Sequence, residues 1–243
     1  MDKTMIVGLH LNDFKLLSNI TRKIRSKEFT LRHIENLPKK SDQIDVVISE
    51  KRLKNCPIPQ IQPQNLDIIE LRIRHAYYNC GNVLIGIDPG GTCGLAVIGK
   101  NRILYRNEFD NINDLVKITE SINLEIGVQI TKIGMGSPPE RQLIVNKLIP
   151  FSKSLQVVNE ESSGSGSHTS AAIRIALRKE SVKALKNYKP KKGEIAWVQK
   201  ESRRLSKGLV TIDKNIAQEI LFGRITMEKA IQKYTEKIKM PQG

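Results

Sequence analysis

The stretch NVLIGIDPGGTCGLAVIGKNRILYRNEF, Asn82 to Phe109, decides how the middle of the chain folds. The apolar run VLIGID ends at Asp88, PGGTC is a turn, GLAVIG is a second strand, and RILYRNEF follows the short turn KN. The pattern predicts a three-stranded antiparallel meander. An ionised carboxylate in an apolar strand costs on the order of several kcal/mol unless it is paired or bound to a metal. Asp88 therefore either serves a site or caps the turn that follows it.

Helices and strands alternate after the meander. A helical pattern over Ile112 to Ile126 precedes the apolar run TKIGMGS, and SPPE opens a second helix, Glu140 to Phe151. The run LQVVN and a helix from His168 to about Leu185 complete the series. Continuous apolar runs joined by helices indicate parallel buried strands. The central segment is thus predicted to be an α/β domain with a mixed sheet in the order βββαβαβα.

The segment before the meander predicts a smaller α/β unit. TMIVGLHL and QIDVVISE are strand-like, and NDFKLLSNITRKIRSK between them has apolar residues at helical spacing, which favours a βαβ start. NCPIPQIQPQN is a linker or an extended crossing segment, and LDIIELRIRHAYYN is a helix leading into the central domain. We therefore predict three parts, which are residues 1–65, 66–182 and a helical extension, 183–243.

Composition limits the class of protein. The chain has 243 residues, of which 39% are hydrophobic and 27% charged, enough for one sizeable domain and a smaller one. The N-terminus turns polar too soon for a secretory signal, and no apolar run approaches the roughly 20 residues that span a bilayer. We expect a cytoplasmic protein that does not enter membranes. Three separated cysteines, Cys56, Cys80 and Cys93, favour buried free thiols over disulfides or zinc.

Positive charge is concentrated at the C-terminal end. Residues 81–177 hold 9 Lys and Arg against 9 Asp and Glu, whereas residues 178–243 hold 17 against 7. A basic tail on a neutral domain is expected when the tail holds a polyanion, most commonly nucleic acid, DNA or RNA. A solvated lysine-rich surface is the alternative.

The residues of the central segment resemble a known superfamily. LIGIDPGGTCGLAVIG, the order of elements, and VVNEESS before an Ala-rich helix resemble the ribonuclease H-like superfamily, within it the RuvC-like Holliday-junction resolvases and their YqgF-like relatives. The resemblance covers about residues 82–182. It implies a nuclease, a hydrolase of phosphodiesters that uses Mg²⁺ or Mn²⁺ held by carboxylates at the ends of neighbouring strands.

The resemblance also implies the site residues. Asp88 stands at the position of the first acid. Aligned without gaps on the relatives' Asp-Glu-Arg-x-Thr pattern, Glu160 stands at their glutamate and Ser163 at their threonine. Glu160 is then the second metal ligand, expected at the end of the strand next to that of Asp88. Glu161 would exchange with it if the register slipped by one residue. A solvated acidic turn before SSGSGS is the alternative.

Two departures from the pattern of the relatives leave the set of acids incomplete. Resolvases carry a glutamate on the fourth strand, where this chain has KIGMGSPPE, with no acid before Glu140. The relatives also place an aspartate at the start of the last helix, where GSHTS offers His168, Thr169 and Ser170. His168 can bind metal or orient a water as a neutral imidazole, or it is a residue at the helix start.

The tail itself suggests a binding surface. Arg178 to Gly208 holds 11 Lys and Arg against 3 Asp and Glu, together with the only tryptophan. The tryptophan could stack on unpaired bases or anchor its helix to the domain. The predicted nucleic-acid-binding residues are Lys189, Lys191, Lys192, Trp197, Lys200, Arg203, Arg204 and Lys207. A helix-turn-helix hairpin follows, whose apolar stripe would be buried by the main domain, a second copy or a protein partner.

Three functions are compatible with these features. The first is a metal-dependent nuclease on structured or branched nucleic acid, and the second is a binding protein that kept the fold and lost the chemistry. The third follows from IDPGGT, which also resembles the first phosphate loop of the sugar-kinase and actin superfamily. Those enzymes need a second domain of the same fold, and the roughly 60 residues after residue 182 are too few to supply it.

Overall fold

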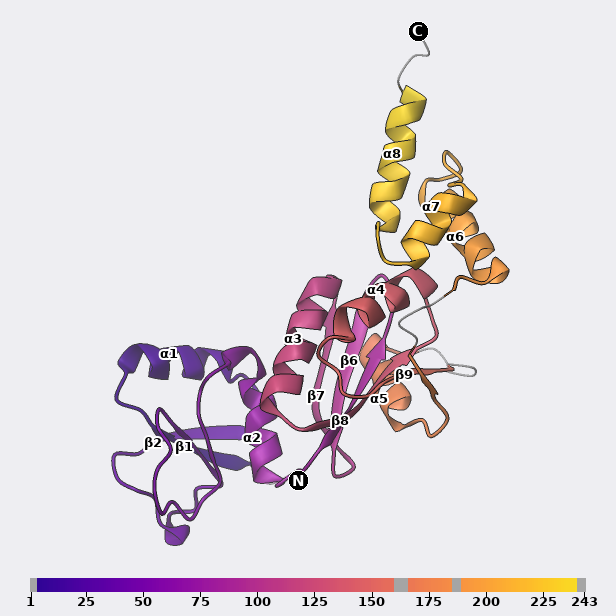
Figure 1. Cartoon of the computed structure of the whole chain (residues 1–243). Coiled ribbons are helices and arrows are strands. Elements are labelled where there is room, and N and C mark those ends of the chain that lie inside the picture. The colour runs from indigo at the N-terminus through magenta and orange to yellow at the C-terminus, as the bar shows by residue number, and fades with distance from the viewer. Residues whose placement is uncertain (1–3, 160–165, 185–188, 240–243) are drawn as a thin grey trace.

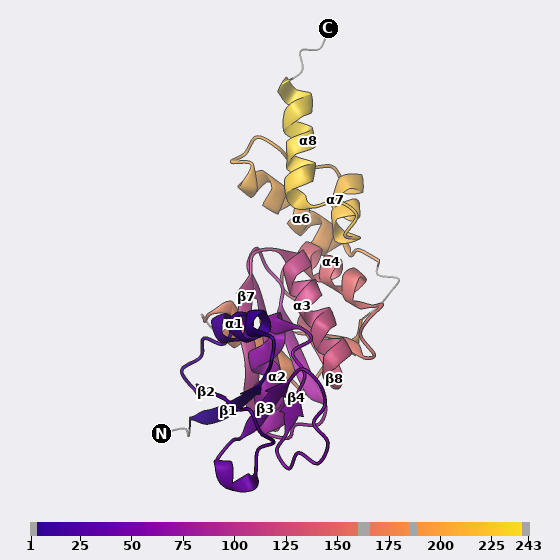
Figure 2. The ribbon, with the colours of Figure 1, turned by 90° about the vertical axis from the view of Figure 1, so that its left-hand side faces the viewer.

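The structure is a computed structural model that describes residues 4–159, 166–184 and 189–239 (Figure 1). The chain is a mixed α/β protein with two sheets, followed by three C-terminal helices. An N-terminal sheet unit, a larger central sheet and a helical bundle follow one another in space in the order of the chain (Figures 1 and 2). The predicted boundaries at residues 65 and 182 stay predictions.

The N-terminal unit is a parallel sheet of four strands in the order β2-β1-β3-β4. Its elements are β1 (Met5–His10), α1 (Phe14–Lys23), β2 (Phe29–His33), the 3-10 turn η1 (Lys40–Asp42), β3 (Val46–Ser49) and β4 (Gln60–Ile61). The two strands and the helix predicted from sequence are present, and β2 and β4 are additional. β4 lies inside the proline-rich segment that was predicted to be a linker or an extended crossing segment, and it pairs with β3.

One helix belongs to two hydrophobic cores. After the turn η2 (Leu66–Ile68), α2 (Ile69–Tyr77) places Ile69 and Ile73 in the core of the N-terminal sheet. Leu71 packs instead into the core of the central sheet. On the same helix Arg72 forms an ion pair of 2.9 Å with Glu125 of the central part. The N-terminal unit is therefore joined to the central sheet through a shared buried helix.

The central sheet has six strands in the order β10-β9-β8-β5-β6-β7. Its elements are β5 (Val83–Asp88), β6 (Cys93–Gly99), β7 (Arg102–Phe109), α3 (Ile112–Glu125), β8 (Val128–Gly134), α4 (Pro138–Leu148), β9 (Leu155–Val158), α5 (His168–Leu177) and β10 (Val182–Lys183). The predicted antiparallel meander β5-β6-β7 is present, and β8 and β9 run parallel to β5.

Two details of the central sheet differ from the sequence prediction. β9, which precedes Glu160, does not pair with β5, because β8 lies between them. The expected helix from His168 to Leu185 ends at Leu177, and the short strand β10 then pairs with β9. Lys132 on β8 accounts for part of this stop. Its ammonium donates to the carbonyls of Ala176 (3.1 Å) and Arg178, which are main-chain acceptors at the helix end.

The two faces of this sheet are covered differently. Helices α3 and α4 cover one face of the sheet (Figure 1). Ile85 and Ile87 of β5 belong to the apolar cluster on this face, together with residues of α3 and α4. Gly86 and Asp88 alternate with them and point to α5. A Cβ on Gly86 would lie 2.0 Å from the carbonyl oxygen of Ala172 in α5. The helix can approach the sheet this closely only because glycine has no side chain.

The C-terminal part is a bundle of three helices with its own core. The helices are α6 (Lys192–Leu205), α7 (Lys214–Leu221) and α8 (Met227–Lys239). Ile195 and Val198 of α6 pack with apolar residues of α7 and α8. Residues beyond α6 were predicted to form a hairpin whose apolar stripe would be buried by the main domain, a second copy or a protein partner. In the structure Ile195 and Val198 of α6 pack on this stripe, and contact with a second copy or a protein partner stays a prediction.

Within the described ranges, none of the helices is both long enough and apolar enough to cross a membrane.

Gly86→Ala tests the close approach of α5. We expect a loss of about 3 kcal/mol in the free energy of unfolding, because the added methyl meets backbone atoms that cannot rotate away. Gly81→Ala is the matched control, since a Cβ there meets no atom within 4 Å, and its effect should stay within about 0.5 kcal/mol. Urea unfolding of both variants measures the difference. Equal stabilities would contradict the described packing.

Candidate functional site

Asp88 and His168 form the centre of the candidate site. Asp88 is the last residue of β5 and is only 9% exposed. His168 begins α5, after Ser167 has capped that helix by accepting a bond from the amide of Ser170. The His168 Nδ1 atom lies 2.9 Å from Oδ2 of Asp88. A neutral imidazole that donates from Nδ1 keeps Nε2 as an acceptor, so the pair can take up a proton or offer a nitrogen to a ligand.

A second carboxylate lies in the same row of the sheet. Asp88 pairs with Gly94 of β6, and Gly94 pairs with Glu108 of β7, so the side chains of Asp88 and Glu108 are on the same face. Glu108 Oε1 accepts a bond of 3.3 Å from the amide of Thr169 in the first turn of α5. Gly94 leaves room for that turn, because a Cβ there would lie 2.1 Å from the carbonyl oxygen of His168.

Glu108 was not singled out from the sequence. The sequence did contain a signal for Glu108. Two tight turns make β7 run in the same direction as β5, so the acidic end of RILYRNEF lies at the same edge of the sheet as Asp88. Asp110, just beyond β7, lies at this edge too. Its Oδ1 accepts a bond of 2.7 Å from the hydroxyl of Thr92 in the turn after β5.

Cys93 at the start of β6 is a buried thiol next to these acids. Burial is the main cause that raises its pKa, and the negative charges of Glu140, Asp88 and Asp110 act in the same direction. The thiol therefore stays protonated at neutral pH, and it lies 3.3 Å from the Gly90 carbonyl. Cys80 and Cys93 are buried free thiols, as predicted, whereas Cys56 is only half-buried.

The predicted second ligand lies outside the described residues. Glu160 and the alternative Glu161 follow β9, and the structure describes neither of them. β9 ends at Val158, one strand beyond the neighbour of β5, so the expectation that Glu160 follows a strand paired with that of Asp88 is corrected. Over residues 4–159, 166–184 and 189–239, no three His, Cys, Asp or Glu side chains group as a metal site would require.

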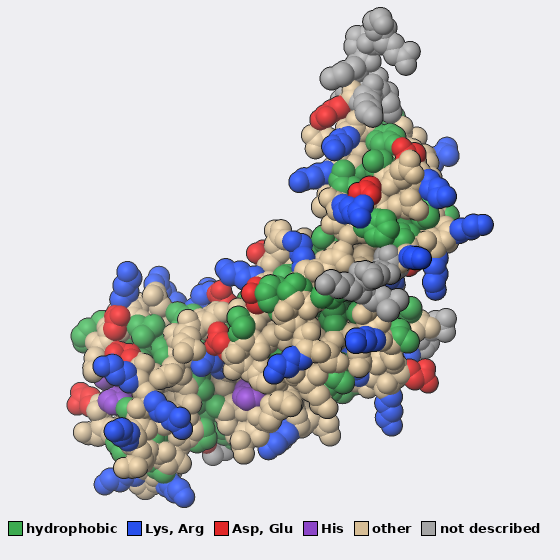
Figure 3. All heavy atoms as spheres, viewed as in Figure 1, with side chains coloured by type: hydrophobic (Ala, Val, Ile, Leu, Met, Phe, Trp, Pro, Cys, Tyr) green, Lys and Arg blue, Asp and Glu red, His purple; other side chains and the backbone are tan. Residues whose placement is uncertain are grey.

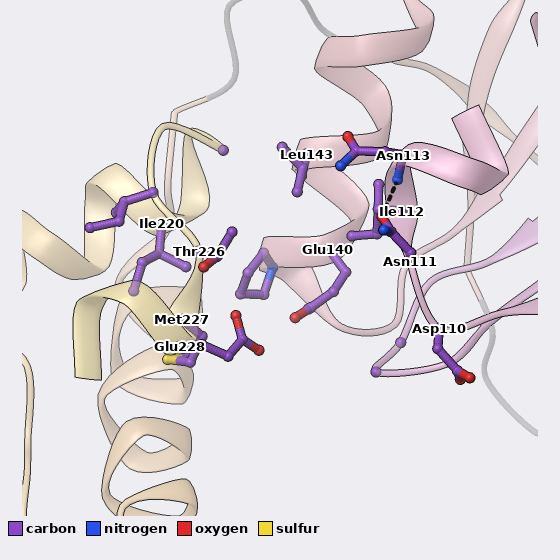
Figure 4. A pocket seen from close by; sticks show the side chains of 15 residues that line it. Asp110, Asn111, Ile112, Asn113, Glu140, Leu143, Ile220, Thr226, Met227 and Glu228 are labelled. Atoms are coloured by element: carbon purple, nitrogen blue, oxygen red, sulfur yellow. Dashed lines mark hydrogen bonds between the residues drawn. The ribbon is translucent and has the colours of Figure 1, made fainter. Parts of the chain in front are cut away.

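A pocket of about 340 Å³ opens beside this edge, between the central part and the bundle. Gly90 and Gly91 of the turn after β5 line one side, and residues 225–228 at the start of α8 line the other. Glu140 of α4 and Glu228 of α8 extend toward one another from opposite walls, whereas Asp110 points away (Figure 4). The bundle is thus a direct neighbour of the loop that follows Asp88.

Polar contacts hold the bundle on α4. Arg141 forms an ion pair of 2.8 Å with Glu194 in the first turn of α6, and it also donates to the carbonyl of Met135, just after β8. The Arg141 side chain is only 8% exposed. At the other end of the seam, Asn146 of α4 donates to the carbonyl of Phe222 after α7 (2.6 Å). These contacts place the start of α6 near the end of β8.

The predicted nucleic-acid-binding residues lie on the surface of the bundle and its lead-in. All eight are at least partly exposed, namely Lys189, Lys191, Lys192, Trp197, Lys200, Arg203, Arg204 and Lys207. Lys and Arg side chains are spread over the bundle in Figure 3. Trp197, 37% exposed, lies outside the apolar cluster of the bundle.

A double-mutant cycle tests the contact between α4 and α6. Arg141→Met and Glu194→Gln should each cost about 2–3 kcal/mol of unfolding free energy, because each removes one member of a largely buried ion pair. The double variant should lose clearly less than the sum, with a coupling energy of about 1 kcal/mol or more. Arg224→Met and Glu219→Gln, an exposed pair within the bundle, supply the control cycle, whose coupling should stay below about 1 kcal/mol. Additive losses in the first cycle would contradict a direct contact.

Comparison with known proteins gives a match to the bundle. A family described as a three-helical-bundle domain matches residues 191–236, in agreement with the three helices α6 to α8. No curated protein matches the chain at a significant level. The family match covers less than half of the chain, so it describes the C-terminal bundle alone.

Proposed function

We propose that the protein processes nucleic acid, with a ribonuclease H-like central part that hydrolyses phosphodiesters at the edge formed by Asp88 and His168. The order of elements from β5 to α5 is βββαβαβα, the order on which the resemblance to RuvC-like and YqgF-like proteins rests. The observation that carries the proposal is the contact of 2.9 Å between a nearly buried carboxylate at the end of the central strand and a half-exposed imidazole.

Residues of this edge have the right chemistry for a divalent metal. Carboxylate oxygen suits both Mg²⁺ and Mn²⁺. Asp88 is one such donor, and Glu160 or Glu161 would have to supply a second. A bound metal would polarise the phosphate and lower the pKa of a water. In this proposal Asp88 orients the ring of His168, which receives or donates a proton at Nε2.

The bundle supports nucleic acid as the partner. Segment 178–243 carries an excess of ten positive charges, and many of its Lys and Arg are exposed on the bundle, whose helix α8 lines the pocket beside the proposed edge. Phosphate contacts by such residues give affinity that falls as salt rises, on either DNA or RNA. We place this activity in the cytoplasm.

A second candidate function is nucleic-acid binding without cleavage. The observation in its favour is the end of β8, where KIGMGSPP supplies no acid before Glu140, and Glu140 is engaged with the hydroxyl of Ser137. The sugar-kinase alternative is not proposed. It requires a second domain of the same fold, whereas the part after residue 189 that the structure describes is a helical bundle.

Asp88→Asn tests the catalytic proposal. The amide keeps the shape of the side chain and removes its negative charge, so cleavage that depends on Mg²⁺ or Mn²⁺ should fall by at least about a hundredfold while binding changes little. Branched DNA, duplex RNA and unpaired RNA with Mn²⁺ are the substrates to compare. If the wild-type protein binds one of them tightly and cuts none, cleavage is excluded and the binding function stands.

Substitutions at Asp88 and around it should reduce cleavage to different extents. Glu160→Gln should reduce cleavage as strongly as Asp88→Asn, whereas Glu161→Gln should be mild. His168→Ala should lower the rate by about a hundredfold, since general acid–base groups contribute roughly 10²–10⁴. Thr169→Ala, at the next position of α5, is the control and should leave the rate within about twofold. A His168→Ala variant of full activity would make His168 a residue of the helix start only.

A further inference from the structure

We propose that the outer face of α6 binds unpaired nucleotides, with Trp197 stacked on a base. The inference rests on the proposed function and narrows its partner to nucleic acid with a single-stranded segment. It is carried by the arrangement of aromatic and cationic side chains on one helix face.

The face is defined by helical spacing. One side of α6 faces the bundle core and carries the buried residues Ile195, Val198 and Ser202. Trp197, Lys200 and Arg204 follow each other at intervals of three and four, so they share the opposite side, which faces solvent. Arg203 and Lys207 are exposed next to this row.

Trp197 is placed as a stacking side chain would be. It is 37% exposed although it carries the largest apolar surface of any residue type, and it is not among the buried residues that form the bundle core. Ile195, Val198 and the ion pair of Glu194 with Arg141 hold the helix on the rest of the molecule. The alternative from the sequence, that Trp197 anchors its helix to the domain, stays a prediction.

The charge around Trp197 fits a phosphate backbone. Lys200 lies one turn from Trp197, and Arg204 lies two turns away. Glu201 binds the Arg204 guanidinium through both carboxylate oxygens, which restrains its position without removing it from the surface. A flat aromatic ring beside cations is the combination that holds a base and its phosphates. An acidic protein would pair with the cations but would leave the Trp197 ring without a stacking partner.

The surface leads to the proposed catalytic edge. The first turn of α6 is tied through Glu194 to Arg141, which is bonded to the main chain at the end of β8. Nucleic acid lying along α6 therefore has one end close to the strands that carry the site. Stacking on Trp197 needs a base whose face is open, which a continuous duplex does not provide. Substrates with an unpaired segment are the class that fits.

The fluorescence of Trp197 reports on this surface directly, because it is the only tryptophan. The full chain is titrated with a single-stranded oligonucleotide of mixed sequence and, separately, with the blunt duplex of that sequence at the same salt. Binding is followed independently by the anisotropy of a label on the nucleic acid. We expect quenching of Trp197 by the single strand and little quenching by the duplex.

Variants separate stacking from general attraction. Trp197→Leu should weaken single-strand binding about tenfold, in line with about 1–3 kcal/mol per stacked base, and should change duplex binding less than about twofold. Leu209→Ala, an exposed apolar residue after α6, is the control and should leave both affinities unchanged. Lys200→Gln should weaken binding more than Lys214→Gln, whose lysine is exposed at the start of α7. Unfolding curves confirm that each variant is folded.

The outcomes distinguish the two proposals. Single-strand binding that leaves Trp197 fluorescence and the affinity of Trp197→Leu unchanged overturns the α6 surface, while nucleic-acid processing stands. An equal loss of single-strand and duplex binding in Trp197→Leu also overturns stacking, since the ring then contacts the backbone. Absence of binding to any nucleic acid overturns the surface and the proposed function together.

Discussion

The contact between α5 and the first two strands of the central sheet determines the geometry of the candidate site. Gly86 and Gly94 allow the backbone of α5 to lie directly on β5 and β6, where any side chain would collide with the main chain of the helix. This packing places the first residue of α5, His168, over the end of β5 and within 2.9 Å of Asp88. Asp88 and His168, which are 80 positions apart in the sequence, are thus in contact because the glycines of β5 and β6 leave space for α5.

Local patterns predicted the strands better than the ends of the helices. VLIGID, GLAVIG and RILYRNEF contain their own turns and apolar runs, so the meander follows from short-range chemistry. The stop of α5 at Leu177 could not be derived in that way. It coincides with the ammonium of Lys132, far away on β8, and with the pairing of β10 to β9. β4 was missed for a similar reason. Its two residues lie among prolines and form a strand only because they pair with the neighbouring strand β3.

The sequence named Asp88 and His168 as candidates but could not predict that they touch. Their distance depends on tertiary packing, which periodicity does not contain. Glu108 was missed because its location at the same edge as Asp88 becomes apparent only when the directions of the three meander strands are followed from β5 to β7. The segment of α6 was predicted to be helical, but its packing into a bundle with α7 and α8 was not predicted. Ile195 and Val198 stand among lysines, and the basic composition dominated the interpretation of that segment.

A directed ion pair sets how the bundle lies on the central part. The core of the bundle is internal to α6, α7 and α8, whereas the pair of Arg141 with Glu194 connects its first helix to the end of β8. Apolar contacts tolerate sliding, but a guanidinium that bonds both a carboxylate and a carbonyl fixes an orientation. Such a pair adds little net stability after its desolvation. Its effect is on geometry, because the first turn of α6 is kept at a defined place near the end of β8.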